Sequence, residues 1–394
     1  MLDKKVKQSL TDKHILCFGN SPSFFIQNPL RVEWFGAYSS LHGSSRLTSA
    51  INVYQVASVS QNQERVLRII SPHYPAINLS FDKTAFDADK GTTLDLIDQM
   101  IKSLKKQQIN PYQGINIFID SDHKHSFHFG TSSGFLLLIL EAILISSKGK
   151  PSLTIEEKLS IIHSIEQLQL HRPIHFHDAL PMLTGGSTFF EIDKQQIPIY
   201  QRKMGTFKQY KIVTLSFHNF IYQPHLSIKN IVEQMNIIAQ HYLQKRLIDV
   251  DPLTFQHDAR QLGLLYGTKA IAKANHFFQE NLATKQSFLA LEKEDELGFS
   301  HLLVQAQKRD FDWLEHHLVS SPSELKISNT IKWLKTHFPK ISFRLHGFGF
   351  QADFLLLIPV DGYREIFARL KKQFYQDQLK EIRIVNQGIR VFNI

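Results

Sequence analysis

The sequence predicts an α+β fold divided into two domains, and two features support this prediction. The first third is rich in β-forming runs, whereas the second half alternates helical stretches with a few strands. A length of 394 residues is enough for two separate hydrophobic cores. We place the boundary near residue 195, in the polar segment DKQQIPI, so that the predicted domains span residues 1–195 and 196–394.

Strands dominate the prediction for the first domain. The runs expected to form strands lie at residues 32–40, 51–60, 64–71, 115–120 and 187–193, and a further run at 199–217 follows the boundary. Apolar residues at helical spacing predict helices at 92–106, 135–145 and 154–168. The first of these is the only helix expected in the first third. Thr154 followed by Glu157 is a capping box for the last, and residues 171–188, with two prolines and a glycine pair, are expected to form a loop.

Helices dominate the prediction for the second half. They are expected at residues 228–244, 262–286, 296–319, 323–337 and 363–371. Between the last two, residues 341–360 form a strand–loop–strand unit, and residues 381–394 form a closing strand.

Composition excludes several classes of protein. The charged fraction of 21% is ordinary for a globular chain, and with Cys17 as the single cysteine no internal disulfide can form. The first 14 residues are too charged for a signal peptide. The longest apolar run, 135–140, is far shorter than the roughly 20 residues of a membrane span. We therefore expect a cytoplasmic protein without membrane contact.

The formal net charge of +9 invites a nucleic-acid interpretation, which the distribution of the charges opposes. Lysines and arginines are spread along the chain, and the densest short cluster is Lys102, Lys105 and Lys106. The chain also lacks zinc-finger spacing and RNP-type aromatic motifs. We expect no nucleic-acid binding, since a basic surface suits an anionic nucleotide equally well.

Four segments, in order, resemble motifs of the galactokinase branch of the GHMP small-molecule kinases. NPLRVEWFGAYSSLHGSSRLTSAI (28–51) resembles the first motif, FHFGTSSGFLLL (127–138) the glycine-rich second, and FRLHGFGFQADFLLL (343–357) the third. KANHFFQEN (273–281) resembles the family pattern Arg-Ala-x-His-x-x-x-Glu. The resemblance implies the GHMP kinase fold: an N-terminal β-rich domain with a left-handed βαβ unit and a C-terminal ferredoxin-like domain. ATP and sugar would bind in the cleft between them.

The resemblance also implies a catalytic pair. The family's catalytic Asp, which takes the proton of the acceptor hydroxyl, falls on Asp178, and the Arg that pairs with it falls on Arg31. A buried Asp beside Arg stays ionised and oriented, which suits it to accept a proton. The alternative is a plain ion pair that holds a strand to a loop.

The sugar-binding positions of the family are altered. Its Glu, His and Asp of motif one correspond to Ala37, Tyr38 and Ser40. Each lost charge-assisted hydrogen bond costs roughly 1.5–3 kcal/mol, so we predict that galactose is not the acceptor. In motif three, Gly347 and Gly349 are retained as candidate substrate-binding residues, although a turn that needs positive φ explains them equally well.

The phosphate loop is degraded rather than deleted. The candidate nucleotide-binding residues are Gly130, Thr131, Ser132, Ser133 and Gly134. A helix beginning there would direct its positive N-terminal end toward phosphate, and Ser133 aligns with the family's magnesium-contacting serine. Alternatively, Thr131 or Ser132 caps the helix.

Bulky residues stand where the family has glycines in this loop. Phe127, His128 and Phe129 occupy the glycine-rich stretch, and aromatic residues do not let phosphate approach the backbone as glycines do. We therefore expect weak ATP binding, assisted by Mg²⁺ at Ser133 and a neighbouring carboxylate. The histidine clusters at 122–128 and 171–178, including His175 and His177, lack any known zinc spacing, so solvated or hydrogen-bonded histidine is the better interpretation.

Two hypotheses remain. The first is an ATP-dependent kinase of a sugar or sugar-like hydroxyl other than galactose. The second is a non-catalytic galactokinase-like sensor or scaffold that binds a ligand or a protein partner. Arg31 and Asp178 favour the first hypothesis, and the altered first and second motifs favour the second.

Overall fold

A computed structural model describes most of the chain. The described residues are 2–393, apart from 73, 83–91, 110, 112, 122–128, 148, 150–151, 171–177, 193–197, 218–224, 315–321, 347–352 and 376–377. For residues 167–170, 198, 225–228 and 322–325, only the backbone is described.

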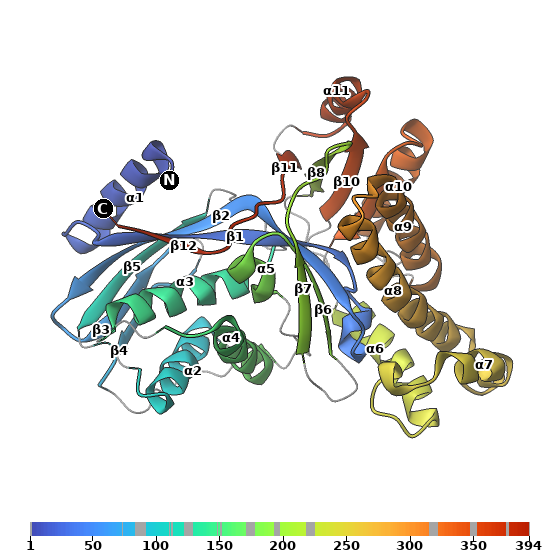
Figure 1. The fold of residues 1–394 in the computed structure, drawn as a ribbon, viewed down its shortest axis with the longest axis horizontal. Helices are drawn as coiled ribbons and strands as arrows, with labels where there is room; N and C mark the ends of the chain where they lie inside the picture. The colour runs from blue at the N-terminus through green and yellow to red at the C-terminus, as the bar shows by residue number, and fades with distance from the viewer. Residues whose placement is uncertain are drawn as a thin grey trace.

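Helices and strands alternate irregularly along the chain (Figure 1). The α-helices are α1 (Lys4–Phe18), α2 (Thr93–Lys106), α3 (Thr131–Ser146), α4 (Ile155–Leu170), α5 (Ala179–Thr184), α6 (His225–His241), α7 (Pro252–Tyr266), α8 (Thr268–Glu292), α9 (Glu296–Arg309), α10 (Pro322–His337) and α11 (Tyr363–Gln373). Short helical turns are η1 (Ser39–His42), η2 (Leu247–Asp249) and the π-helical η3 (Asp310–Leu314). The strands are β1 (Phe24–Phe35), β2 (Arg46–Asn62), β3 (Val66–Ile70), β4 (Ile77–Ser80), β5 (Gly114–Ser121), β6 (Ser187–Ile192), β7 (Pro198–Lys203), β8 (Tyr210–Ser216), β9 (Ser342–His346), β10 (Asp353–Pro359), β11 (Leu379–Ile382) and β12 (Arg390–Asn393).

The larger sheet contains eight strands. Its main path runs β12-β1-β2-β5-β3-β4, and β6 and β7 extend it from β2. Most neighbours are antiparallel, but β3 and β5 are parallel, and the chain between them passes through β4 and α2, so a parallel strand pair connected through a helix is present as expected. Because successive side chains point to opposite faces, each long strand presents one row of residues to each face of the sheet.

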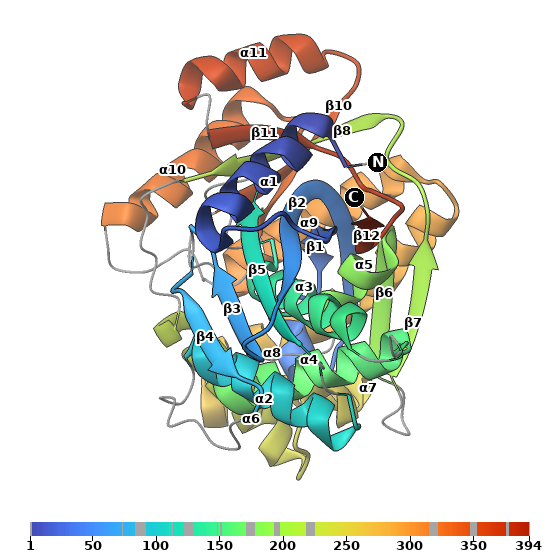
Figure 2. The ribbon, with the colours of Figure 1, turned by 90° about the vertical axis from the view of Figure 1, so that its left-hand side faces the viewer.

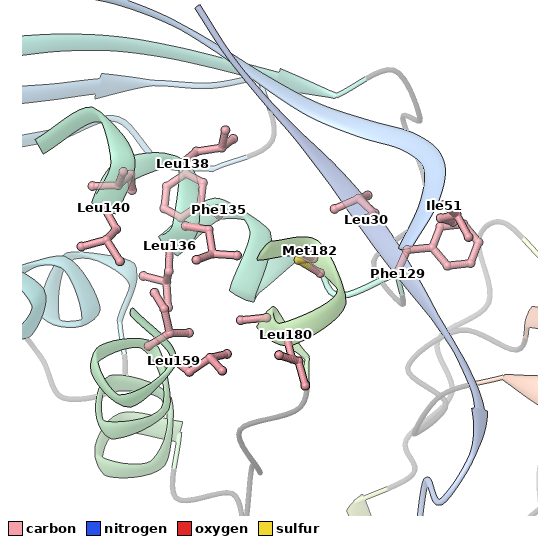
Figure 3. Close-up of a cluster of buried hydrophobic side chains, with 14 of the residues drawn as sticks. Leu30, Ile51, Phe129, Phe135, Leu136, Leu138, Leu140, Leu159, Leu180 and Met182 are labelled. Atoms are coloured by element: carbon pink, nitrogen blue, oxygen red, sulfur yellow. The ribbon is translucent and has the colours of Figure 1, made fainter. Parts of the chain in front are cut away.

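Helices cover both faces of this sheet. In Figure 1, α2, α3, α4 and α5 lie on one side of it and α1 on the other, and Figure 2 shows the same arrangement from the left. Helix α3 is apolar around almost its whole circumference, because it is enclosed between the sheet and the neighbouring helices. Figure 3 shows Leu136 of α3 on the side of Leu159 of α4 and Leu180 of α5, whereas Leu138 points to the opposite side, toward the sheet.

The smaller sheet has four antiparallel strands in the order β11-β8-β10-β9. Numbered along the chain, this order is 4-1-3-2, with α11 between the last two strands and helices including α10 between the first two. That is the ferredoxin-like arrangement that the sequence predicted. Val213, Leu356 and Phe354 face a core formed with α10.

A third, largely helical cluster lies beside the end of β1. Helices α6, α7 and α8 bury residues such as Met235, Phe255 and Phe277 against one another. The turn that follows β1 inserts Ala37 and Tyr38 into the same cluster, so this turn is held by helix packing.

Three helical elements differ from the prediction. Helix α1 is a second helix in the first third, capped by the Asp3 side chain and ended by left-handed Gly19. The expected loop 171–188 contains α5, which packs Leu180 and Met182 into the core. Helix α7 begins at Asp251 and Pro252, before the single helix expected at 262–286, and Gly267 separates it from α8.

Of two other expectations, one is corrected by the structure and one is confirmed. The predicted closing strand is two strands, since β11 belongs to the smaller sheet and β12 pairs with β1. The capping box is confirmed: Thr154 Oγ1 accepts from the Glu157 N–H (3.2 Å), and Glu157 Oε2 accepts from the Thr154 N–H (2.7 Å). Among the described residues, no helix combines the length and apolar character that crossing a membrane would require.

Candidate active site

Asp178 contacts two arginines from neighbouring strands. Its Oδ2 lies 2.8 Å from Arg31 Nη2, as the sequence predicted, and its Oδ1 lies 3.1 Å from Arg46 Nη2. Asp178 is the N-cap residue of α5, but its side chain makes no capping bond and is directed to the arginines instead. Arg46 also forms an ion pair with Glu33, and both of these side chains are buried.

Strand alternation explains why these groups meet. Arg31 and Glu33 are two residues apart on β1, so both point to one face of the sheet. Glu33 pairs with Thr48 of β2, and Arg46 lies two residues before Thr48 on the same face. The cluster is therefore a consequence of register, and α5 brings Asp178 to it.

The arginines decide the charge of Asp178. Burial alone would raise the pKa of this carboxyl, but Arg31 and Arg46 outweigh burial and lower the pKa to about 2. Asp178 is thus a carboxylate at every physiological pH. Its side chain is 20% exposed, whereas those of Arg31 and Arg46 are 5% and 3% exposed, so Asp178 is the accessible member of the cluster.

A second carboxyl close by has the opposite behaviour. Ser133, in the first turn of α3, donates a hydrogen bond from Oγ to Glu166 Oε1 of α4 (2.7 Å), and both residues are buried. Burial first, and the negative charge of Asp178 second, raise the pKa of Glu166 to about 8. Glu166 therefore holds a proton at neutral pH unless a cation comes near it.

At the start of α3, two glycines are closely approached by side chains of other elements. Gly130 is its N-cap, with φ of +78°, and a Cβ there would clash with Met182 and Arg31. Thr131 and Ser132 therefore do not cap the helix, which corrects that alternative. Gly134 serves packing as well, because a Cβ on it would clash with Gln55 and Asn28.

Phe129 is part of the core and of the strand pairing. Its carbonyl accepts from the Arg31 N–H (2.9 Å), its side chain is fully buried, and its ring packs against His346 with centroids 5.6 Å apart. Figure 3 shows it beside Ile51. The side chain of Phe129 is thus held in the core, and the weak phosphate binding expected from the loss of glycine at this position stays a prediction.

The predicted sugar-binding residues Ala37, Tyr38 and Ser40 are all buried. Ala37 and Tyr38 pack in the helical cluster with Met235 and Phe277, and Ser40 Oγ donates to the Ala37 carbonyl (3.2 Å). These positions contribute to a hydrophobic core and to a local turn, so they offer an acceptor no charged group.

Helix α8 and strand β9 hold this turn in place through a buried ionic network. Arg344 binds Asp310 (Nε to Oδ2, 2.7 Å) and Glu280 (Nη1 to Oε1, 2.7 Å), and His276 Nε2 lies 2.8 Å from Asp310 Oδ1. Glu280 Oε1 accepts from the Gly36 N–H (2.9 Å). His276 and Glu280 are the His and Glu of the KANHFFQEN motif, one helical turn apart, so the motif positions the turn after β1.

This network does not need a metal ion. His276, Glu280 and Asp310 each offer a ligand atom, and these atoms lie within 4.8 Å of one another. However, Arg344 contacts both carboxylates and Arg309 Nη2 lies 3.5 Å from Glu280 Oε2, so two guanidinium groups already balance the two carboxylates. Burial alone would raise the pKa of Asp310, but Arg344 and His276 hold it well below its usual range.

Part of the predicted site lies outside the described residues. This applies to Phe127, His128, His175, His177, Gly347 and Gly349. The described start of motif three is His346, whose Nε2 accepts from the Glu33 N–H (2.9 Å), so the smaller sheet reaches the cluster around Asp178.

Three residues of this site escaped the sequence analysis: Glu33, Arg46 and Glu166. Glu166 carried a signal, because it falls on the buried face of α4 with Ile162 and Ile165. Glu33 lies within a strand whose other residues are almost all buried, which is also unusual for a carboxylate. Arg46 follows a run of serines and carried no comparable signal.

Comparison with known proteins is consistent with this arrangement. No protein-family model matches the chain. A galactokinase of Levilactobacillus brevis is 21% identical over 394 residues, covering 94% of each chain. The crystal structure of Lactococcus lactis galactokinase complexed with galactose superposes with a TM-score of 0.77 at 15% identity, covering 98% of this chain and 99% of that one.

Other sugar and small-molecule kinases share the architecture. Methanococcus jannaschii mevalonate kinase has a TM-score of 0.62 at 15% identity, covering 94% of this chain and 96% of its own. A D-glycero-D-manno-heptose 1-phosphate kinase from Bacteriodes thetaiotaomicron has a TM-score of 0.61 at 13% identity, covering 94% and 99%. This chain has the GHMP kinase fold. Within that GHMP kinase fold, the βαβ unit, the ferredoxin-like sheet and the α8 motif occur in the expected order.

Proposed function

We propose that this protein is an ATP-dependent kinase that phosphorylates a hydroxyl of a sugar or sugar-like acceptor other than galactose. The observation that carries the proposal is Asp178, an accessible carboxylate fixed by Arg31 and Arg46. Asp178 lies close enough to the buried Ser133–Glu166 pair for its charge to raise the pKa of Glu166. A proton acceptor thus lies next to hard oxygen ligands at the start of a helix, which is the combination phosphoryl transfer requires.

Asp178 would orient the acceptor hydroxyl and receive its proton. As the hydroxyl oxygen bonds to the γ-phosphorus of ATP, the bond from that phosphorus to the β–γ bridging oxygen breaks, ADP leaves, and the proton passes to Asp178 and then to water. A carboxylate with a pKa of about 2 is a weak base. In a loose transition state the hydroxyl needs little activation before the bond forms, so position and a late proton transfer suffice.

Ser133 and Glu166 fit a magnesium ion. A hydroxyl and a carboxylate are the oxygen ligands that Mg²⁺ prefers, and it usually completes its shell with water and substrate phosphates. The raised pKa of Glu166 is consistent with a carboxylate whose negative charge is balanced only when a cation is present. When bound, Mg²⁺ would neutralise charge on the phosphates; Ser133 and Glu166 would hold it beside the N-terminus of α3.

Galactose does not suit the described part of the site. The galactose-bound relative and this chain share a fold at 15% identity, but Ala37, Tyr38 and Ser40 here are buried and uncharged. We therefore propose a different acceptor, recognised by groups around Asp178.

The first test is nucleotide binding, because a kinase and a non-catalytic sensor or scaffold differ there. A fluorescent ATP analogue should bind saturably, with an affinity that falls at least about 10-fold when Mg²⁺ is removed or when Ser133→Ala is introduced. Ser9→Ala, at an exposed position of α1 outside the candidate site, is the control and should bind as the wild type does. An absence of saturable binding at millimolar nucleotide would refute the kinase proposal.

A further inference from the structure

Three polar atoms around Asp178 lack a hydrogen-bond partner among the described residues. They are Asp178 Oδ1, Arg46 Nη2 and Glu33 Oε2, and all three are buried. Oδ1 and Nη2 form an ion pair with each other at 3.1 Å, and no other described group bonds to either atom. Buried charged groups are nearly always hydrogen-bonded, and leaving one unbonded costs more than about 1–3 kcal/mol, so each of these atoms requires an explanation.

The chemistry of the three atoms defines what they can bind. Arg46 Nη2 is a donor, because a guanidinium carries only N–H groups. Asp178 Oδ1 and Glu33 Oε2 are acceptors, since the pKa of Asp178 is low and Glu33 is paired with Arg46. A donor adjacent to an acceptor is complementary to a hydroxyl group, which accepts one hydrogen bond and donates another.

The charge of the cluster indicates a neutral ligand. Arg31 and Arg46 carry two positive charges, and Glu33 and Asp178 carry two negative charges, so the described cluster is electrically balanced. A carboxylate or phosphate of an acceptor would face Glu33 and Asp178 without a free cation to compensate it. Neutral hydroxyls add no net charge to the balanced cluster.

We propose that Arg46 and Glu33 are acceptor-recognition residues of this chain, and that they bind hydroxyls of a neutral polyhydroxylated acceptor. This inference rests on the proposed kinase function and specifies its substrate class. One acceptor hydroxyl donates to Asp178 Oδ1 and accepts from Arg46 Nη2, and a second donates to Glu33 Oε2. The recognition that Ala37, Tyr38 and Ser40 cannot provide is thereby supplied by one residue each of the neighbouring strands β1 and β2.

The experiment compares neutral monosaccharides, their monodeoxy analogues and sugar acids as acceptors of wild type and of Arg46→Met. For the best neutral acceptor, Arg46→Met should raise KM about 10- to 100-fold, the loss of one charge-assisted hydrogen bond. One monodeoxy analogue should show the same loss with the wild type and no further loss with Arg46→Met. Arg46→Lys, which keeps a donor, should recover part of the affinity.

Folding and catalysis are controlled separately. Arg46→Met leaves Glu33 buried without its partner, which can destabilise the protein. The double variant Glu33→Gln/Arg46→Met removes both charges, so KM can still be compared with the wild type if the single variant is unstable. Arg65→Met, at an exposed ion pair with Asp82, is the matched arginine control and should leave KM unchanged.

Binding calorimetry separates failure of the inference from failure of the kinase proposal. If a neutral sugar binds the wild type, loses affinity with Arg46→Met and is never phosphorylated, the inference stands and the kinase proposal fails. Three results would overturn the inference: equal affinity in wild type and Arg46→Met, which leaves only a bound water at this position; a preference for sugar acids; or no binding of any neutral polyhydroxylated compound at tens of millimolar.

Discussion

Glu166 titrates in the physiological range, and this makes the stability of the protein depend on pH. The pKa of this carboxyl is raised to about 8 in the folded chain, chiefly by burial, from an ordinary value of 4.5. Between pH 4.5 and 8 the folded state therefore holds a proton that the unfolded state has lost. By linkage, the contribution of Glu166 to stability is fully present below pH 4.5 and is lost as pH rises through 8.

Glu166→Gln should remove this dependence. We expect the free energy of unfolding of the wild type to fall from pH 5 to pH 8 by up to about 1.4 kcal/mol per pH unit from this group, and the variant to show a flatter profile over that range. Urea denaturation at several pH values measures this, with the exposed Glu64→Gln as control. Identical pH profiles for wild type and Glu166→Gln would mean that Glu166 is already ionised in the folded protein.

Single residues of the site were predictable where a motif preserved them. The contact of Arg31 with Asp178 followed from the resemblance, because the fold conserves the positions of strand and loop. Arg46 and Glu33 were not predictable in that way. Their meeting depends on the register of β1 with β2, which a bulge shifts after Glu33, and register is a tertiary property.

At the scale of elements, helix α8 connects the smaller sheet to the turn after β1. Arg344 on β9 binds Asp310, Glu280 of α8 and the Trp34 carbonyl (2.7 Å). Because Arg344 is the one residue that contacts both buried carboxylates, its removal leaves Asp310 with His276 and Glu280 with the longer contact to Arg309 (3.5 Å). Breaking a buried ion pair by removing one partner typically costs about 3–5 kcal/mol.

Arg344→Leu should therefore lower the free energy of unfolding by more than about 3 kcal/mol and weaken the packing of the turn that holds Gly36. Arg369 is an exposed residue of α11 whose guanidinium lies 4.6 Å from the centre of the Phe338 ring. Arg369→Leu should lower the free energy of unfolding by less than about 1 kcal/mol. Chemical denaturation followed by circular dichroism compares the two. A cost for Arg344→Leu no larger than that for Arg369→Leu would show that the network is not essential to stability.

Elements with strong local signals were predicted well, and elements defined by sparse signals were not. Helix α2 agrees with its prediction within one residue, because its apolar face is regular. Helix α1 buries only Leu10 and His14, the latter between the Ser58 and Ser60 hydroxyls, so its apolar periodicity is weak. Its Asp3 cap and Gly19 end, and the Asp251–Pro252 start of α7, were the available signals.

In the whole molecule, the chain returns to its starting sheet at its end. Strand β12 pairs with β1, with Phe392 opposite Phe25, and Ile384 bridges Ile51. The ferredoxin-like sheet is thus inserted in the chain between β7 and β12, which both belong to the larger sheet. The domain boundary near residue 195 stays a prediction. Composition and local pattern indicated an α+β chain, but the specific architecture came from the resemblance, since strand order across distant segments leaves no local signal.

The kinase account as a whole is tested most directly by transfer of the γ-phosphate of labelled ATP to a neutral monosaccharide. With Mg²⁺ and a panel that includes galactose, the account predicts a labelled sugar phosphate for at least one acceptor other than galactose. Asp178→Asn should slow that transfer about 10²–10⁴-fold, the usual contribution of a positioned base, while the exposed control Asp82→Asn retains it. Transfer to galactose with a micromolar KM, transfer unaffected by Asp178→Asn, or no labelled product with any acceptor would contradict the account.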